Sequence, residues 1–435
     1  MPDPHPPFCP PPLIIREALL CPPGGEIKPC DIFLREGIIA AVGPARSIDV
    51  PSEIQTLSAT GLYLFPSFID AHVHLREPGH EYKEDIASGL GAAAHGGFGT
   101  VLAMANTKPC NDAASVTRFM RERAELSWPH GPRLLPVGAL TVGLAGTTLS
   151  PMGELARAGC VAFSNDGVPV ANTEIFRRGM EYAAQWGKIV IDHCEDPFLT
   201  MDAHMNEGNM SGRLGVKGHP SVAEALHVAR DILLAEYLDL PVHLAHISCR
   251  QSVELLWFAR RKGIKVTAET CPHYLFLDET ALDGYNANAK INPPLRSAED
   301  VTALRKALAN GLFDMLATDH APHAAHEKED TLDAAPSGVI GLETAVPLTF
   351  ALVRDKEISL SAFLELWHYG PARVFHLPCV NFSPGDSADI FLFDPDQEWT
   401  VSRETLRSKS LNTPFLNSVM RGRVVAHWLG GHRVV

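Results

Sequence analysis

Residues 62–79 have the sequence LYLFPSFIDAHVHLREPG, an apolar run followed directly by polar residues of metal-binding types. The apolar part predicts a buried β-strand. His72 and His74 are two positions apart, so on a strand both imidazoles point to the same face. Two imidazoles side by side suit a zinc site. For this pair alone, two buried structural histidines remain the alternative interpretation.

Seven further strand-like runs follow the first, and helical patterns separate them. Eight strand–helix alternations in one chain predict an α/β fold, a TIM-like (β/α)8 barrel with parallel strands, rather than an open sheet. The eight runs are Leu62–Ile69, Thr100–Ala105, Arg133–Leu140, Cys160–Ser164, Lys188–Asp192, Pro241–Ala245, Lys265–Glu269 and Asp314–Thr318.

Three helix boundaries are recognisable between these runs. Ser221 with Glu224 predicts a capping box, as does the segment 297–300, Ser-Ala-Glu-Asp. After the first box, the spacing predicts that one helix face points inward, formed by Leu226, Ala229, Ile232 and Leu233. The basic segment 260–262 followed by Gly263 predicts a helix end.

Both ends of the chain have the pattern of short strands. Residues 13–42 contain such strands with a predicted Pro-Pro-Gly-Gly turn at 22–25, and strands are also expected at 389–393 and 423–428. We therefore expect a barrel at 61–380 and one small, discontinuous β domain, made of residues 13–60 and 381–435.

Composition restricts the class of protein. The 435 residues are 46% hydrophobic and 20% charged, as in ordinary globular proteins, and the net charge of −14 disfavours nucleic acid and anionic membranes. No apolar run reaches the roughly 18 residues of a membrane span. Nine cysteines without a CxxC pair argue against a disulfide framework and against a cysteine zinc site. Residues 1–12 lack signal-peptide order, so the cytoplasm is the expected compartment.

Further polar residues stand where the barrel would gather them. His193, His246 and Asp319 close the fifth, sixth and eighth runs, and strand C-termini carry the active sites of such barrels. Packing alone does not explain them, because buried polar groups without a common partner are costly. Asp166 follows the fourth run in Asn-Asp-Gly, where a turn residue and a ligand are equally good interpretations.

The segment 72–79, HVHLREPG, resembles the signature of the amidohydrolase superfamily, and of dihydroorotases in particular. The resemblance extends from about residue 31 to residue 417 with every motif in order. The other matching motifs are 104–109 (MANTKP), 193–196 (HCED), 292–296 (NPPLR) and 317–323 (ATDHAPH).

The resemblance implies a metal site and its ligands. Many superfamily members bridge two metals with a carbamylated lysine after the fourth strand, but no lysine occurs between Lys108 and Lys188. Type I dihydroorotases have an Asp-Gly motif there, which Asp166-Gly167 matches, and hydantoinase-type relatives depend on the lysine. The implied site holds one or two Zn²⁺ ions, with the ligands His72, His74, Asp166, His193, His246 and Asp319.

The implied reaction is the reversible cyclisation of N-carbamoyl-L-aspartate to L-dihydroorotate in de novo pyrimidine biosynthesis. Asp319 is expected to act as general acid and base. Arg76 lies two residues beyond His74 and is expected to bind the substrate carboxylate, with a surface salt bridge to Glu77 or Glu81 as the alternative. The resemblance adds further substrate-binding residues, namely His74, Asn106, Asn292, His323, Ser337 and Gly338.

One position departs from the family pattern. Dihydroorotases have a Phe-Gly pair near the end of the polar loop 326–338, where this chain has Ser337-Gly338, so an aromatic wall is missing. Glu195 and Asp196 are interpreted as helix-opening charges, with a role as hydrogen-bond partners of the metal ligands as the alternative.

Two other functions compete with this one. Another cyclic amidohydrolase, such as an allantoinase, would leave Arg76 without a carboxylate to bind. An inactive homologue serving as a scaffold for aspartate transcarbamoylase would be expected to lack ligands. As partners, the resemblance implies a homodimer and a complex with aspartate transcarbamoylase.

Overall fold

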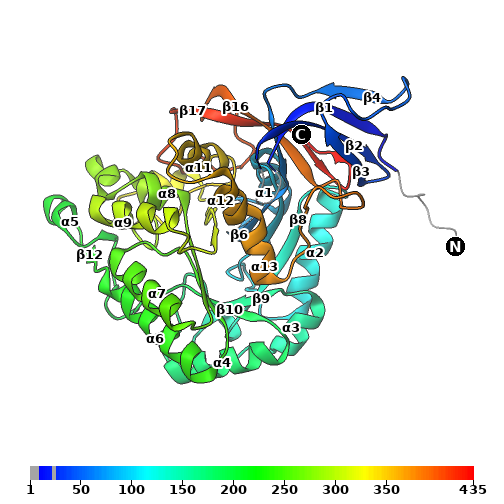
Figure 1. Cartoon of the computed structure of the whole chain (residues 1–435). Coiled ribbons are helices and arrows are strands. Elements are labelled where there is room, and N and C mark those ends of the chain that lie inside the picture. Colours follow the sequence, from blue (N-terminus) through cyan, green and yellow to red (C-terminus); the bar gives the residue numbers. More distant parts are fainter. Residues whose placement is uncertain (1–8, 22–25) are drawn as a thin grey trace.

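Eight parallel strands form a nearly closed barrel, which confirms the predicted TIM-like fold (Figure 1). The computed structural model describes residues 9–21 and 26–435, so the turn predicted at 22–25 lies outside the described residues. The barrel strands, in order, are β6 (Phe68–Val73), β7 (Phe98–Ala103), β8 (Arg133–Ala139), β9 (Ala162–Ser164), β10 (Ile189–Asp192), β13 (Val242–Leu244), β14 (Val266–Thr270) and β15 (Met315–Leu316).

The first and last barrel strands meet through residues at their C-terminal ends. Val73 forms a parallel bridge with His320, and the His74 N–H donates to the His320 carbonyl oxygen at 2.8 Å. The buried Asp70 carboxylate accepts hydrogen bonds from the Thr318 N–H and hydroxyl. This closure brings the segment after β6 beside the segment after β15, although about 250 residues separate them.

Helices surround the barrel and connect its strands (Figure 1). The longer ones are α1 (Ile86–Gly96), α2 (Ala114–Ser127), α4 (Thr173–Gln185), α6 (Val222–Leu238), α7 (Arg250–Lys262), α9 (Ala298–Ala309) and α11 (Ala345–Arg354). Shorter helical segments are η1 (Val142–Leu144), α3 (Met152–Ala158), α5 (Asn209–Leu214), α8 (Pro272–Phe276), η2 (Glu279–Tyr285), η3 (Ala287–Ala289), α10 (Ala325–Lys328), α12 (Leu360–Leu364), η4 (Glu365–Tyr369) and α13 (Gly370–Phe375).

Two of the three predicted helix boundaries are confirmed. Ser297 caps α9 in a capping box with Asp300, and Gly263 ends α7 with φ of +68° after a basic last turn. The capping box at Ser221 is wrong, because Ser221 makes no side-chain cap and the buried Glu224 instead accepts from Ser248.

The predicted inward face of α6 is also wrong in part. Leu226 and Leu233 are 49% and 60% exposed, whereas the buried side of the helix contains Val228 and Ile232. Since the helix begins without the expected cap, its rotation is determined by packing against the barrel rather than by the local pattern.

Both chain ends build a second, mixed sheet beside the barrel, where the blue and red strands of Figure 1 lie together. The first predicted run proves to be two strands, since β5 pairs with β1 and β16 in this sheet and only β6 enters the barrel. The sheet contains β1 (Leu13–Leu20), β2 (Lys28–Arg35), β3 (Ile38–Pro44), β4 (Gln55–Ser58), β5 (Tyr63–Pro66), β16 (Ile390–Thr400), β17 (Val419–Leu429) and β18 (His432–Arg433). A separate pair is formed by β11 (Met205–Asn206) and β12 (Gly218–His219).

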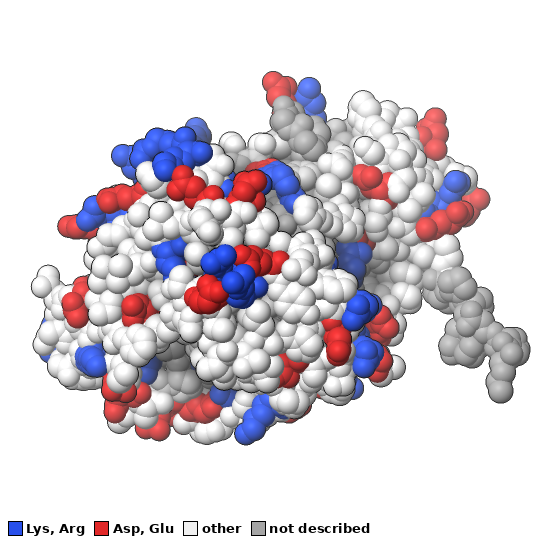
Figure 2. Space-filling view, turned by 90° about the horizontal axis from the view of Figure 1, so that it is seen from below, with Lys and Arg blue, Asp and Glu red and all other residues white. Residues whose placement is uncertain are grey.

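The surface shows no large region of one charge on the face drawn in Figure 2, where acidic and basic side chains are intermixed apart from one compact basic group. None of the described helices has the length and hydropathy needed to cross a bilayer.

Candidate functional site

All six residues predicted as metal ligands lie at the C-terminal ends of barrel strands. His72 is on β6 and His74 follows it, while the other four stand after β9, β10, β13 and β15. All six side chains are buried, and they are His72, His74, Asp166, His193, His246 and Asp319.

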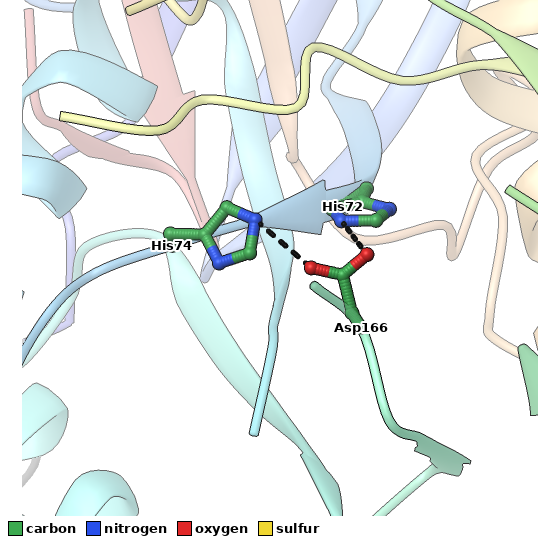
Figure 3. Close-up of side chains that lie close together, drawn as sticks. All are labelled: His72, His74 and Asp166. Atoms are coloured by element: carbon green, nitrogen blue, oxygen red, sulfur yellow. Dashed lines mark ion pairs between the residues drawn. The ribbon is translucent and has the colours of Figure 1, made fainter. Parts of the chain in front are cut away.

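Asp166 lies in the middle of the four histidines. Its Oδ1 is 3.3 Å from His72 Nε2 and its Oδ2 is 3.4 Å from His74 Nε2 (Figure 3). The same Oδ1 is 3.3 Å from His246 Nε2. His193 Nδ1 is 3.6 Å from the same carboxylate. The turn that carries Asp166 thus directs its side chain into the cluster.

Asp319 reaches the cluster from the segment after β15, which lies beside the end of β6. Its Oδ1 lies 3.1 Å from His74 Nε2 and 3.7 Å from His72 Nε2. The structure therefore brings together every residue of the predicted metal site.

The donor set fits a divalent metal. Two groups of potential ligand atoms, each within 4.8 Å of one another, share Asp166: His72 with His74, and His193 with His246. Imidazole nitrogens with carboxylate oxygens are the ligands that Zn²⁺ prefers in catalytic sites. The buried His72 Nε2 has no hydrogen-bond partner among the described residues, although it faces Asp166.

The electrostatics of the cluster favour positive charge at its centre. Burial acts to lower the pKa of His72, but the carboxylates of Asp166, Glu269 and Asp319 together outweigh it and hold the pKa well above its ordinary value. Burial also opposes protonation of His193, yet hydrogen bonds to Asp166 and Glu195 raise the pKa of His193 to about 10. A divalent cation bound among these side chains would balance the negative charge of the buried carboxylates, as protonated histidines do.

Three of the histidines are oriented by a partner on the ring nitrogen that points away from the cluster. His72 Nδ1 is 3.2 Å from Glu269, His74 Nδ1 is 2.8 Å from Asn106, and His193 Nε2 is 2.8 Å from Glu195. Such partners fix the ring and its tautomer. The interpretation of Glu195 as a helix-opening charge is therefore wrong, since no helix starts there and its carboxylate contacts His193.

Glu269 has a place in this site that the sequence reasoning did not assign. It ends the seventh predicted run, as the candidate ligands end theirs, and that position was the available signal. Its second oxygen lies 3.2 Å from His243 Nε2. The seventh barrel strand, β14, thus contributes a carboxylate that orients the His72 ring through its Nδ1, on the side away from the cluster.

A cavity of about 220 Å³ opens above the cluster. Every predicted metal- and substrate-binding residue except the fully buried His72 lines it, and Gly167 and Ala321 complete the wall. The cavity therefore gives a small molecule access to Asp166 and Asp319 and places further polar groups around it.

Arg76 stands in the wall of this cavity without an acidic partner. Its Nε donates to the Pro322 carbonyl oxygen at 3.1 Å, and among the described residues no carboxylate lies within ion-pair distance of its guanidinium. The alternative surface salt bridge is not formed, because Glu77 pairs with Arg123 and Glu81 accepts from Gly79. Burial lowers the pKa of Arg76 to about 10, as expected for a cation that lacks a counter-ion.

His323 is held as a neutral imidazole. Burial first, and then the charges of Arg76 and Lys83, lower its pKa to about 2. The Lys83 ammonium lies 3.2 Å from His323 Nδ1, while His323 Nε2 lies 2.9 Å from the Ser337 carbonyl oxygen and 3.3 Å from the Arg76 guanidinium. Lys83 was not predicted from the sequence.

Glycine is the residue type that the backbone and the neighbouring atoms at position 338 accommodate. Its φ of +143° disfavours any side chain, and an added Cβ would lie 2.8 Å from the Ala321 carbonyl oxygen. Its N–H donates to the Lys290 carbonyl oxygen, and its own carbonyl accepts from Asn412. Both backbone groups of Gly338 are therefore already engaged.

Asn292 is the remaining predicted substrate residue, and it lines the cavity. Its side-chain amide donates to Glu195 at 2.7 Å and lies 3.3 Å from His193 Nε2.

Three residues of the site adopt left-handed backbone conformations that only glycine adopts easily. They are Arg76, His246 and Asp319, with φ of +63°, +34° and +46°. Such conformations cost of order 1–3 kcal/mol each and persist where the surrounding fold imposes them. The barrel rim therefore stabilises an arrangement of these side chains that the local backbone alone would not adopt.

Comparison with known proteins identifies the family of the chain. The family model described as dihydro-orotase-like matches residues 61–252. A dihydroorotase from Geobacter metallireducens is 44% identical over 419 residues, covering 96% of this chain and 98% of that protein. The chain belongs to the dihydroorotase family. This membership makes it a cyclic amidohydrolase, an enzyme that acts on cyclic amides.

Other relatives agree with this dihydroorotase-family assignment. A dihydroorotase from Geotalea daltonii is 45% identical and covers 90% of this chain and 91% of that protein. Among solved structures, an L-hydantoinase (dihydropyrimidinase) from Arthrobacter aurescens has a TM-score of 0.85 at 23% identity and covers 97% of this chain and 96% of that chain. That likeness shows the fold that dihydroorotase-family chains share with hydantoinases.

Proposed function

We propose that this chain is a type I dihydroorotase that interconverts N-carbamoyl-L-aspartate and L-dihydroorotate in de novo pyrimidine biosynthesis, with zinc as its metal. The observation that carries the proposal is the half-buried guanidinium of Arg76, which has no acidic partner among the described residues and lines the same cavity as the histidine–carboxylate cluster. Dihydroorotate contains a cyclic amide and a carboxylate. Its amide would lie at the histidine–carboxylate cluster, and its carboxylate would lie at Arg76.

The proposed ligands are His72, His74, Asp166, His193, His246 and Asp319, and the two groups of potential ligand atoms among them would hold one or two zinc ions. Zinc bound there would supply Lewis-acid activation of water at neutral pH. Glu269, Asn106 and Glu195 hold the three imidazoles that they contact in position for that metal.

Asp319 is the proposed general acid and base. Its carboxylate lines the cavity and lies 3.1 Å from His74 Nε2, so it can collect the proton of the attacking water. It then delivers that proton to the amide nitrogen that leaves as the ring opens. In the cyclisation direction the same oxygen takes a proton from the ureido nitrogen.

Arg76 is the proposed partner of the substrate carboxylate, since a guanidinium binds carboxylate in a planar, two-pronged geometry. Asn106, Asn292 and His323 are proposed to hold the rest of the substrate, with His74, Ser337 and Gly338 beside them. Because the backbone of Gly338 is engaged by Lys290 and Asn412, we assign the contact at this point to Ser337.

Asp166 supports the type I assignment. No lysine occurs between Lys108 and Lys188, so a carbamylated lysine has no place at the end of β9, and Asp166 occupies that position. This distinction separates the proposal from hydantoinase-type chemistry, although the fold is the same.

The proposal is tested by measuring the absorbance change of dihydroorotate with purified enzyme, before and after chelation. We expect turnover that is lost with the metal and restored by zinc. An allantoinase would open allantoin instead, and an inactive scaffold would turn over neither ring; either result would refute the proposal.

A homodimer, a complex with aspartate transcarbamoylase and a cytoplasmic location remain predictions, and light scattering with and without added transcarbamoylase tests the first two.

A further inference from the structure

Two buried lysines lie beneath the loop that covers one side of the cavity. Lys328 ends α10 and is 7% exposed, and Lys290 follows η3 and is 4% exposed. Neither touches the histidine–carboxylate cluster. Their hydrogen bonds connect the segment 287–290 with the loop 324–338.

The hydrogen bonds are reciprocal. Lys328 Nζ crosses to the carbonyl oxygens of Ala287 at 2.9 Å and Lys290 at 3.2 Å, and it also binds Pro336 in its own loop at 2.8 Å. Lys290 Nζ crosses in the other direction, to the carbonyl oxygens of Leu332 at 2.6 Å and Asp333 at 3.2 Å.

Each ammonium thereby uses its full set of donors. An ammonium group has three N–H donors, and Lys328 directs all three at backbone carbonyl oxygens. The third contact of Lys290 Nζ is His204 Nδ1, at 3.3 Å. We refer to these two side chains and their carbonyl partners as the lysine clasp.

The clasp contains no counter-ion. Within residues 9–21 and 26–435, no carboxylate oxygen lies within ion-pair distance of either Nζ. Burial, and next to it the charge of Lys290, lowers the pKa of Lys328 to about 7. Burying two ammonium groups with only carbonyl oxygens and a histidine as partners lowers the stability of the fold. Their presence therefore indicates that the connection between segment 287–290 and loop 324–338 has a function.

That connection ends at the cavity wall. Lys328 holds the Pro336 carbonyl, while the Lys290 carbonyl accepts the Gly338 N–H at 2.9 Å. Ser337 is therefore fixed from both sides, with its carbonyl oxygen 2.9 Å from His323 Nε2. Two residues beyond Lys290 is Asn292, which also lines this cavity.

We propose that Lys290 and Lys328 are positioning residues for substrate capture, which hold the Ser337 wall of the cavity at a fixed distance from the Asn292 wall. This inference rests on the proposed function, because it assumes a small cyclic substrate held between the two walls. The lysines act through the loop and take no part in the proton transfer at Asp319.

The test compares Lys328→Met and Lys290→Met with the wild-type enzyme. Methionine keeps an unbranched apolar stem and removes the donors, and Lys306→Met is the matched control because Lys306 is exposed on α9. We expect KM for dihydroorotate to rise about tenfold or more in Lys328→Met, with kcat changed less than about threefold, since loss of bonds to a charged group is worth roughly this factor. Hydrogen exchange of the amides in 330–338 should become faster while the zinc content stays unchanged.

Unchanged KM and unchanged loop exchange in both variants would overturn the proposal, and so would an equal fall of kcat with unaltered KM. Lys290→Met removes only three of the six contacts, so it decides the question if Lys328→Met does not fold. If the wild-type enzyme does not turn over dihydroorotate, the proposed function fails, while the exchange measurement still decides whether the clasp orders the loop.

Discussion

At the scale of single residues, the site depends on how few of its polar groups are left unpaired. Most buried polar side chains around the cluster are engaged, as Glu269 is with His72 and Glu195 with His193. Arg76 differs, because its guanidinium lines the cavity and no carboxylate among the described residues lies within ion-pair distance of it. A charge with little access to water and no counter-ion is costly, so Arg76 is the position where an anionic ligand contributes most.

Asp319→Ala is predicted to abolish turnover and leave the fold intact. Removal of the acid–base group should lower kcat about 10³-fold or more. The measurement is the absorbance assay with metal content determined in parallel, and Asp49→Ala, at an exposed position between β3 and β4, is the control. Retention of more than a tenth of the wild-type kcat would show that another group moves the proton.

Arg76→Gln is predicted to weaken substrate capture. Glutamine removes the charge-assisted pair with the substrate carboxylate, so KM should rise about 10- to 100-fold with a smaller change of kcat. Arg118→Gln, on the exposed side of α2, should leave both constants unchanged. An unaltered KM for Arg76→Gln would refute its assignment to the carboxylate.

At the scale of elements, segments far apart in sequence are joined by carboxylates that accept hydrogen bonds from backbone N–H groups. Glu224 on α6 binds the N–H groups of Ser248 and Cys249 at the start of α7. Glu343, before α11, binds those of Arg407 and Ser408 in the connection from β16 to β17. Such contacts fix how helices are placed around the barrel, which a helix pattern alone does not determine.

Glu343→Gln is predicted to remove a pH-dependent part of the stability. Burial raises the pKa of Glu343 from 4.5 to about 7, against its hydrogen bonds to Arg407 and Ser408. The folded protein therefore binds a proton that the unfolded chain releases, so this contribution is complete below pH 4.5 and is lost as pH rises towards 7. Nearby Glu84 adds to the shift and Arg407 reduces it.

The measurement is the urea midpoint of both proteins between pH 4.5 and 8. Glu343→Gln should lose less stability than the wild type as pH rises, with a difference on the order of 2 kcal/mol. Exposed Glu299→Gln is the control. Parallel curves for Glu343→Gln and the wild type would contradict the prediction.

At the scale of the whole molecule, the site exists only in the closed barrel. Its proposed ligands come from β6 and from the segments after β9, β10, β13 and β15, and the bridge between Val73 and His320 brings the first of these to the last. A metal that binds this set binds the folded state and not the unfolded chain, so metal binding and barrel stability are linked.

Chelation of the metal is therefore predicted to lower the melting temperature by several degrees, because a ligand present at 100 times its Kd stabilises the fold by about 2.7 kcal/mol. Differential scanning calorimetry with and without chelator measures the shift, and added zinc should reverse it. His72→Asn should melt at nearly the same temperature with and without chelator. An equal shift in that variant would place the metal elsewhere.

Local sequence determined the strands, their alternation with helices and the polar residues at the strand ends, because burial periodicity and capping are short-range properties. Tertiary structure alone decided that Tyr63–Pro66 leaves the barrel for the terminal sheet and which side of α6 is buried. It also decided that Asp166 faces four histidines, that Arg76 has no acidic neighbour among the described residues, and that two lysines clasp the loop. These features depend on contacts between segments tens to hundreds of residues apart, which a local pattern cannot encode.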